Sequence, residues 1–314
     1  MNILITGCAG FIGSWVTQKL IASGHNIIGV DNFDPYYPKN IKQNNMSEFL
    51  SDERFTFCEA DITDISSLDN IFSKYDIDIV VHLAAKAGVR NSAIYPLDYF
   101  NTNVFGTLCV LECMRKYGTK KIVFSSSSSV YGNCSAEKFT ENITNLKQLS
   151  VYAQTKKTAE DYIEMYNRQY GINAVCLRFF TVYGKRQRPD LAITKFTRQI
   201  KNNEVLTVYG DGSSYRDYTH IEDISSGIIS AIYYDKTPYE IINLGSENPV
   251  KLSDLIYLLE KLIGKKANTN TEPLPAEDMI RTHADISKAK ELLNYSPKIK
   301  FEEGISKFIE DFRD

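Results

Sequence analysis

The residues of this sequence best suited to chemistry are Tyr152 and Lys156, a phenol four positions before an ammonium. In a helix, this spacing places both side chains on one face. A free tyrosine has a pKa of about 10, so it acts as a base near neutral pH only if its pKa falls by about 3 units. One neighbouring cation lowers a pKa by about 1 to 3 units. The pair therefore indicates a catalytic base whose full activation needs a second positive charge from a bound group.

The N-terminal part of the chain alternates between short apolar runs and longer amphipathic runs. Several apolar runs have no polar alternation, which is typical of strands covered on both faces. Alternation of this kind predicts an α/β fold of the Rossmann type, with a doubly wound parallel sheet. The predicted strands cover 2–6, 26–31, 55–61, 77–83 and 121–126, and the predicted helices cover 12–23, 65–75, 96–117 and 151–170.

The pattern becomes less regular after residue 181. Strand-like runs at 205–209 and 240–244 flank a helix-like run at 222–234, and the segment 252–313 is mostly helical in pattern. Because no flexible linker separates the two parts, they are expected to share a core. We predict a main domain at 1–180 that carries the catalytic residues. Residues 181–314 would form mainly a smaller mixed α/β lid that binds substrate, with the chain crossing between the two parts more than once.

Composition excludes several classes of function. The 314 residues carry a net charge of −3 with a pI near 5.9, which argues against nucleic acid or an anionic membrane as a partner. The six cysteines form no Cys-x-x-Cys pair and the four histidines are scattered, so we expect neither a metal site nor a structural disulfide. The first residues lack the pattern of a signal peptide, and no run of 18 apolar residues follows, so a cytoplasmic location is expected.

A glycine-rich turn directly follows the first predicted strand and opens the first helix. Gly7, Gly10 and Gly13 would allow a tight turn, close approach of the backbone to a pyrophosphate, and close packing of helix on strand. Phe11 and Ile12 lie at the start of the helix, where backbone N–H groups and the helix dipole favour an anion. The spacing alone is weak evidence, but its position between strand and helix predicts a dinucleotide site.

Acidic residues close the second and third predicted strands. Asp31, followed by Asn32, can accept hydrogen bonds from both hydroxyls of an adenosine ribose, and its carboxylate would repel a 2′-phosphate. No arginine is near it in sequence, which favours NAD over NADP. Asp61 and Ile62 are expected beside the adenine. An oxidised nicotinamide ring would supply the second positive charge that Tyr152 requires.

With these elements in this order, the chain resembles an extended short-chain dehydrogenase/reductase along essentially its whole length, and within that group the bacterial UDP-glucuronate 4-epimerases. The stretches that carry the resemblance are Asp31-Asn32-Phe33-Asp34-Pro35-Tyr36-Tyr37, residues 82–90, residues 125–132, and residues 177–184 together with Arg188-Pro189-Asp190.

The resemblance implies an NAD-dependent epimerisation at C4 of a UDP-sugar, in which C4 is oxidised, the 4-keto intermediate rotates, and the hydride returns to the opposite face. Tyr152 would remove the 4-hydroxyl proton, Lys156 would lower the Tyr152 pKa and hold the nicotinamide ribose, and Ser127 would hydrogen-bond the C4 oxygen. Asn103 matches the family's active-site asparagine, although a polar residue on a helix face is an equal alternative.

Ser128 and Ser129 stand where related dehydratases and decarboxylases carry acids, so dehydration is disfavoured. A 4-keto uronic acid is a β-keto acid and loses carbon dioxide readily, so its carboxylate must be fixed. We expect Thr181, Ser127 and Ser128 to bind this carboxylate, with Arg188 fixing the loop or the charge nearby.

The remaining substrate residues also follow from the resemblance. Arg216 matches an arginine that binds the UDP diphosphate, and Asp278 matches a carboxylate near the uridine ribose. Arg90 could reach the sugar end or form an ion pair that fixes a loop. Glu277 and Lys185 depart from the family pattern beside substrate-facing segments, which leaves the sugar less certain than the reaction.

The leading prediction is therefore an isomerase that converts UDP-glucuronate to UDP-galacturonate for a surface polysaccharide. The alternatives are a UDP-glucose or UDP-N-acetylglucosamine 4-epimerase, then a UDP-glucuronate decarboxylase, and lastly a non-catalytic NAD-binding protein. The expected partners are the UDP-sugar and a second copy of the chain, paired through the helices at 96–117 and 151–170.

Overall fold

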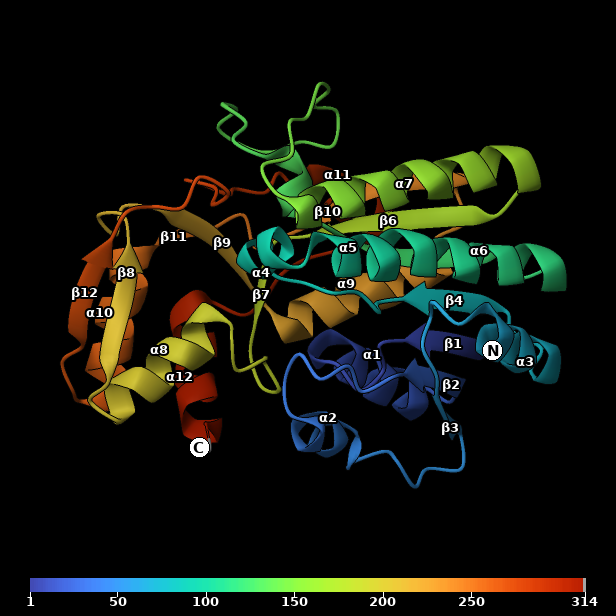
Figure 1. Cartoon of the computed structure of the whole chain (residues 1–314), viewed down its shortest axis with the longest axis horizontal. Helices are drawn as coiled ribbons and strands as arrows, with labels where there is room; N and C mark the ends of the chain where they lie inside the picture. Colours follow the sequence, from blue (N-terminus) through green and yellow to red (C-terminus); the bar gives the residue numbers. More distant parts are fainter. Residues whose placement is uncertain (313–314) are drawn as a thin grey trace.

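A seven-stranded parallel sheet forms the centre of the computed structural model, which describes residues 1–312 (Figure 1). Every pair of neighbouring strands in this sheet is parallel. The predicted Rossmann-type fold with a smaller mixed lid is confirmed. In spatial order the strands are β10 (Tyr239–Leu244), β6 (Asn173–Phe179), β5 (Lys121–Ser127), β4 (Ile79–His82), β1 (Asn2–Thr6), β2 (Asn26–Asp31) and β3 (Phe55–Glu59).

Helices cover both faces of the sheet, because apolar residues alternate in direction along each strand. Ile3 and Ile5 of β1 pack in the hydrophobic core that contains α1 (Phe11–Ala22) and α9 (Ile221–Tyr233). Leu4 points the other way, into the core that contains α3 (Ile65–Lys74), α6 (Gly106–Tyr117) and α7 (Val151–Tyr170). The further helices of the main part are α2 (Lys39–Met46), α4 (Val89–Ile94), α5 (Pro96–Phe100) and the 3-10 turn η2 (Ser128–Tyr131).

The sheet reverses its winding direction between β1 and β4. Strands β2 and β3 extend from one side of β1, whereas β4, β5, β6 and β10 extend from the other. The loops after β1 and β4 are joined by Thr6, whose Oγ1 accepts hydrogen bonds from the N–H groups of Leu83 and Ala84 at 3.2 Å each. Such a switch point leaves a crevice at the carboxyl ends of the strands, where ligands bind in doubly wound folds.

The predicted helix at 96–117 contains an irregular turn. After α5 the backbone forms a π-helix, η1 (Asn101–Phe105), before α6 begins. The wider turn directs Asn103 and Val104 into the protein, where both are buried.

The lid lies at one end of the large sheet, on the left in Figure 1, and has its own core of Tyr183, Phe196, Leu255, Phe308 and neighbouring residues. The chain returns from the lid to the large sheet, because α9 packs on it and β10 pairs with β6. The lid elements are β7 (Thr181–Tyr183), β9 (Tyr215–His220), β11 (Pro249–Lys251), β8 (Val205–Tyr209), β12 (Asn268–Glu272), α8 (Ala192–Lys201), α10 (Leu252–Ile263) and α12 (Phe301–Asp311), with α11 (Ser287–Leu293) against the main part.

Three further observations concern residues 1–312. None of the described helices combines the length and apolar character required to cross a membrane. Within the same residues, no group of three or more His, Cys, Asp or Glu side chains could hold a metal ion. All six cysteines of the chain are free.

Candidate active site

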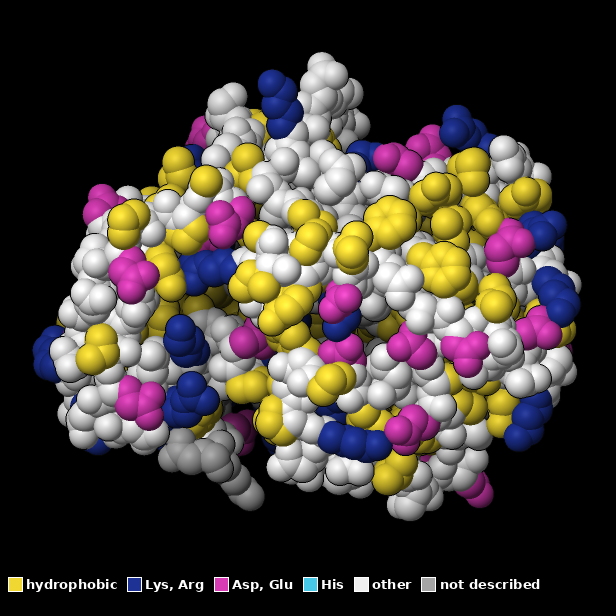
Figure 2. Space-filling view, viewed as in Figure 1, with side chains coloured by type: hydrophobic (Ala, Val, Ile, Leu, Met, Phe, Trp, Pro, Cys, Tyr) yellow, Lys and Arg dark blue, Asp and Glu magenta, His cyan; other side chains and the backbone are white. Residues whose placement is uncertain are grey.

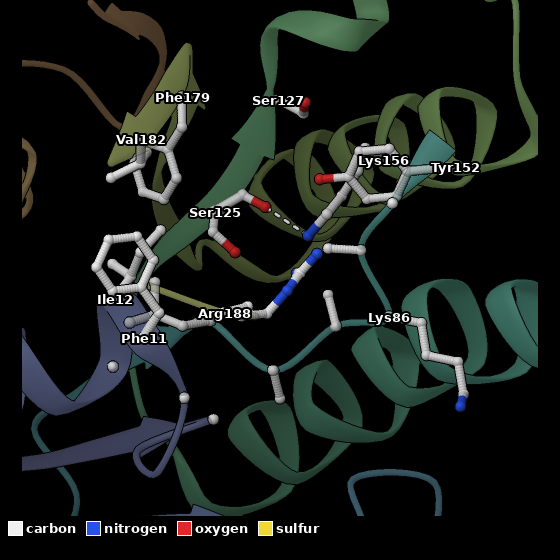
Figure 3. A pocket seen from close by; sticks show the side chains of 18 of the residues that line it. Phe11, Ile12, Lys86, Ser125, Ser127, Tyr152, Lys156, Phe179, Val182 and Arg188 are labelled. Carbon is white, nitrogen blue, oxygen red and sulfur yellow. Dashed lines mark hydrogen bonds between the residues drawn. The ribbon is translucent and has the colours of Figure 1, made fainter. Parts of the chain in front are cut away.

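A cavity of about 480 Å³ lies at the carboxyl ends of the strands, between the large sheet and the lid. Figure 3 shows it from close by, with residues of β5, α1, α7 and the loop of Arg188 facing the same space. The residues predicted for catalysis, cofactor or substrate line this cavity, except Asp61, Arg90 and the candidate Asn103. The lining residues among them are Gly7, Gly10, Phe11, Ile12, Gly13, Asp31, Asn32, Ile62, Ser127, Ser128, Tyr152, Lys156, Thr181, Arg188, Arg216 and Asp278.

The glycine turn has the shape that a bound diphosphate requires. Gly7 has a φ of +74°, and a Cβ there would lie 2.8 Å from the backbone nitrogen of Ala84. A Cβ on Gly13 would lie only 2.0 Å from the carbonyl oxygen of Gly7, so the helix packs directly on the turn. Gly10 caps α1 without a side chain, which leaves the first N–H groups of the helix open toward the cavity. These residues fit the diphosphate of a dinucleotide.

Asp31 ends β2 beside this turn and is held in place by the backbone. Its carboxylate accepts hydrogen bonds from the N–H groups of Ala9 at 3.2 Å and Phe33 at 2.8 Å. Burial raises the pKa of Asp31, and Lys42, whose Nζ lies 3.9 Å from the carboxylate, acts in the opposite direction. Lys42, which was not among the predicted residues, reaches this carboxylate through α2. Asp61 lies just outside the cavity and accepts a hydrogen bond from Asn32 at 2.7 Å.

Tyr152 lies in the first turn of α7, where Ser150 caps the helix by accepting the N–H of Ala153 at 3.1 Å. Burial is the larger effect and raises the pKa of the phenol above its ordinary value, while Ser127 and the positive charge of Arg188 act to lower it. Without a bound cation beside it, the phenol therefore does not have the lowered pKa that the sequence analysis required. Arg188 thus supplies part of the second positive charge that the sequence argument required. Figure 3 shows Arg188 pointing toward the end of the cavity where Tyr152 and Lys156 lie.

Lys156 is buried on α7 and contacts the end of β5. Its ammonium donates to the carbonyl oxygen of Ser125 at 2.6 Å and lies 4.8 Å from the ring centre of Phe124. Burial lowers the pKa of Lys156 to about 7, so near neutral pH this side chain is only partly charged. The groups that lower the Tyr152 pKa are Ser127 and Arg188.

The serines at the end of β5 have different surroundings. Ser127 donates to the hydroxyl of Ser129 at 3.0 Å and accepts the Ser129 N–H at 3.1 Å, at the start of the η2 turn. Ser125 and Ser126 donate to the carbonyl of His82 and the carboxylate of Glu160, at 3.1 Å and 2.6 Å. Ser127 and Ser128 line the cavity together with Thr181, the first residue of β7.

Arg188 is held by residues that the sequence analysis did not select. Its guanidinium forms two hydrogen bonds with Asp190, at 2.9 Å and 2.8 Å, and lies 5.3 Å from the ring centre of Tyr36. The Tyr36 hydroxyl donates to Asp190 at 3.2 Å and accepts from Asn91 at 2.7 Å. Tyr36 follows the Asp31 segment, so the network joins the cofactor side of the cavity to the substrate side.

At the lid, Arg90 and Asp278 contact each other. Arg90 lies outside the cavity lining and donates to the Asp278 carboxylate at 2.6 Å, and its guanidinium lies 3.8 Å from the ring centre of Tyr209. Arg216 faces the cavity and donates to the carbonyl of Tyr215 at 2.9 Å. Its neighbour Asp217 instead accepts the N–H groups of Ser246, Glu247 and Ala284, and in the described part of the chain it forms no salt bridge with Arg216.

Asn103 and His82 are structural neighbours of the site rather than part of its lining. The Asn103 amide accepts the N–H of Lys86 at 2.8 Å, and donates to the Lys86 carbonyl at 2.9 Å and to Thr155 on α7 at 3.0 Å. His82 is buried between the hydroxyls of Thr6 and Thr107, at 2.7 Å and 3.0 Å, and burial lowers its pKa to about 3. His82 is therefore a neutral histidine of the protein core.

Comparison with known proteins agrees with this geometry. The model of the NAD dependent epimerase/dehydratase family matches residues 3–245. A UDP-glucuronate 4-epimerase of Thermodesulfobacterium geofontis is 42% identical, over 98% of this chain and 94% of the relative.

Two solved structures are similar over 99% of this chain and 98% of their own. One is the UDP-glucuronic acid 4-epimerase of Bacillus cereus in complex with UDP-glucuronic acid and NAD, with a TM-score of 0.93 and 36% identity. The other is the UDP-glucose 4-epimerase of Thermotoga maritima with UDP-glucose, with a TM-score of 0.90 and 33% identity. Given the family match over most of the chain and these likenesses along its length, the protein belongs to the NAD dependent epimerase/dehydratase family.

Proposed function

We propose that this protein is an NAD-dependent UDP-sugar 4-epimerase that converts UDP-glucuronate to UDP-galacturonate. The observation that carries the proposal is one cavity with a diphosphate-binding glycine turn at one end and the Tyr152, Ser127 and Arg188 side chains converging at the other. The similar enzymes that act on UDP-glucuronate support the choice of substrate.

Tyr152 and Ser127 carry the proton chemistry in this proposal. NAD, when bound, supplies the acceptor and the donor of the hydride at C4. Tyr152 takes the proton of the 4-hydroxyl. Ser127 donates a hydrogen bond to the C4 oxygen while the C4–O single bond becomes the double bond of the ketone. Because burial favours the neutral phenol, Tyr152 holds that proton securely for return to the other face of the rotated 4-keto sugar. Lys156 would hold the nicotinamide ribose from α7, and Asp31 with Lys42 would hold the adenosine ribose.

The substrate carboxylate would be fixed between Thr181, Ser127 and Ser128, with Arg188 beside it. Burial works against the charge of Arg188, but Asp190 keeps the pKa of the guanidinium above its ordinary value, so it remains positive. A fixed carboxylate cannot easily align with the ketone, which slows the loss of carbon dioxide from the 4-keto intermediate.

The variant Arg188→His tests this role of the loop. We expect it to release a UDP-pentose by-product that the unchanged protein does not form, measured by NMR of the reaction mixture. Arg186→His is the matched control, because Arg186 lies in the same loop but contacts Gln18 and Glu48 outside the cavity. Loss of affinity without any pentose in Arg188→His, or equal pentose from both variants, would show that Arg188 does not protect the carboxylate.

A neutral UDP-sugar is the second candidate substrate, supported by the similarity to an enzyme solved with UDP-glucose. To decide, the purified protein is incubated separately with UDP-glucuronate, UDP-glucose and UDP-N-acetylglucosamine, without added NAD, and the products are identified by NMR. We expect conversion of UDP-glucuronate with a kcat/KM at least tenfold above that of either neutral sugar. Conversion of a neutral sugar alone would overturn the substrate assignment and leave the reaction type intact.

We further propose that the protein works as a homodimer in the cytoplasm. Apolar side chains gather over α4, α5 and α6 in Figure 2, and those exposed by 44 to 81% are Ile94, Tyr95, Leu97, Phe100 and Phe105. A second copy presenting the same face would cover them by two-fold symmetry. Six free thiols support a reducing compartment.

A further inference from the structure

A buried ion pair lies directly behind the catalytic helix, outside the cavity lining. Glu160 of α7 has 0% of its surface exposed and Arg178 of β6 has 2%. The Glu160 carboxylate accepts two hydrogen bonds from the Arg178 guanidinium, at 2.9 Å and 2.8 Å. The guanidinium also lies 4.8 Å from the ring centre of Tyr131, and its Nη1 has no hydrogen-bond partner among the described residues.

Stability alone does not explain such a pair. Removing two charges from water costs several kcal/mol each, and well-packed apolar residues of the same volume are often as stable or more so. The position of Glu160 suggests another role, because this carboxylate also links α7 to β5, the two elements that carry the reacting groups. Glu160 follows Lys156 by four residues on α7, and it accepts the hydroxyl of Ser126 at 2.6 Å. Ser126 lies between Ser125, which accepts the Lys156 ammonium, and Ser127.

Glu160 also shares a helix face with Lys156, at a spacing that brings Cβ atoms within about 6 Å. Lys156 is 3% exposed, and its ammonium is held by a neutral carbonyl rather than by a carboxylate within 4 Å. Burial lowers its pKa, and the negative charge of the Glu160 carboxylate opposes that effect. The groups that face Lys156 from the surrounding elements are Phe124 and Ser125 of β5, Cys176 of β6, His82 of β4 and Glu160 itself.

We propose that Glu160, anchored by Arg178, is a positioning residue that keeps the Lys156 ammonium protonated and holds the end of β5, with Ser127, against α7. Tyr239 of β10 and Cys176 also face Glu160, and both are neutral at physiological pH because burial raises their pKa values. Glu160 is thus the negative charge acting on Lys156 from this side. The inference rests on the proposed roles of Tyr152, Lys156 and Ser127.

The test compares Glu160→Gln with the double variant Glu160→Gln/Arg178→Met. The double variant removes both charges, so it leaves no unpaired buried guanidinium that could prevent folding. Glu164→Gln, one turn further along α7, is the matched control. In protein labelled with ¹³C-lysine, the Lys156 Cε resonance is followed against pH and assigned by its loss in Lys156→Arg. We expect the Lys156 pKa to fall by about one unit or more in Glu160→Gln and by less in the double variant, because loss of the Arg178 charge partly offsets loss of the carboxylate. We also expect kcat to fall at least tenfold with KM within twofold, and the alkaline limb of the kcat profile to move to lower pH.

An unchanged Lys156 titration in the folded variants would overturn the proposal, even if kcat falls, because the pair would then be structural only. If the single variant does not fold, the double variant gives the same decision. The titration needs no substrate, so failure of the proposed function, seen as absence of sugar conversion by the unchanged protein, is distinguished from failure of this inference.

Discussion

Lys156 is a cation in a place where a neutral side chain would be more stable. Burial lowers its pKa from the ordinary 10.5 to about 7, while in the unfolded chain it titrates at the ordinary value. Between pH 7 and 10.5 the unfolded chain therefore binds a proton that the folded protein does not. Through this group the folded protein gains stability as pH rises across that window, and below pH 7 it bears the full cost of the buried charge.

We predict that Lys156→Met unfolds at higher urea concentration than the unchanged protein at pH 7 while losing turnover. The gain should be about 1 to 3 kcal/mol, less than the full cost of the charge because the Ser125 carbonyl loses its donor. Both proteins are freed of NAD, confirmed by absorbance, and unfolded in urea at pH 7 and pH 9.5. The difference should shrink at pH 9.5, and equal stability at both pH values would mean that Lys156 is not desolvated in the folded protein.

For individual residues, a motif in the sequence identifies the side chains that form it. Side chains that only the folded structure brings to the site cannot be identified in this way. Tyr152, Lys156, Ser127 and the glycine turn could be selected because their spacing has a chemical meaning in a strand or helix. Lys42 could not, because it meets Asp31 only through α2, a helix with no strong apolar period. Asp190 stood in a matched stretch, but its two hydrogen bonds to Arg188 required the loop geometry.

The π-helix η1 is the element that fixes the site from the side of β4. Its wide turn places the Asn103 amide where it holds both backbone groups of Lys86 and the hydroxyl of Thr155 on the catalytic helix. Thr155 also donates to the carbonyl of Tyr152 at 2.8 Å. Periodicity predicted one regular helix here, since one irregular turn barely changes the apolar pattern over 22 residues.

We predict that Asn103→Ala destabilises the protein by about 1 to 3 kcal/mol, because buried donors and acceptors on Lys86 and Thr155 lose their partner. Asn101→Ala is the control, since Asn101 is exposed in the same turn and should change stability by less than about 0.5 kcal/mol. Chemical denaturation of both variants gives the comparison. Equal effects would indicate that the Asn103 contacts contribute nothing specific.

Among the elements, strand and helix positions in the first half could be predicted well, because buried parallel strands have continuous apolar runs. The predicted strands at 2–6 and 26–31 and the helix at 151–170 have the observed bounds. The strand predicted at 240–244 corresponds to β10, but its place beside β6 in the large sheet could not be read from local pattern. The short strands of the lid, such as β7 and β11, have three residues each and give no periodic signal.

At the scale of the whole molecule, the exposed apolar face over α4 and α5 makes the proposed dimer testable. Leu97 is 81% exposed at this face, so Leu97→Glu places a charge where a second copy would bury it. We predict that this variant sediments as a monomer at concentrations where the unchanged protein sediments as a dimer. Leu50→Glu, at a leucine that is 51% exposed elsewhere on the main part, should remain dimeric. An unchanged distribution in Leu97→Glu would place the interface on another face.

The central claim is that one molecule of protein removes the hydride from C4 of a UDP-sugar and returns it to the same carbon. The most direct measurement uses UDP-glucuronate labelled with deuterium at C4, incubated with the purified protein without added NAD, with Tyr152→Phe as the inactive control. The account predicts UDP-galacturonate that retains the label at C4, and loss of at least a thousandfold in rate for Tyr152→Phe. Exchange of the label with solvent protons, or an unlabelled product, would contradict it.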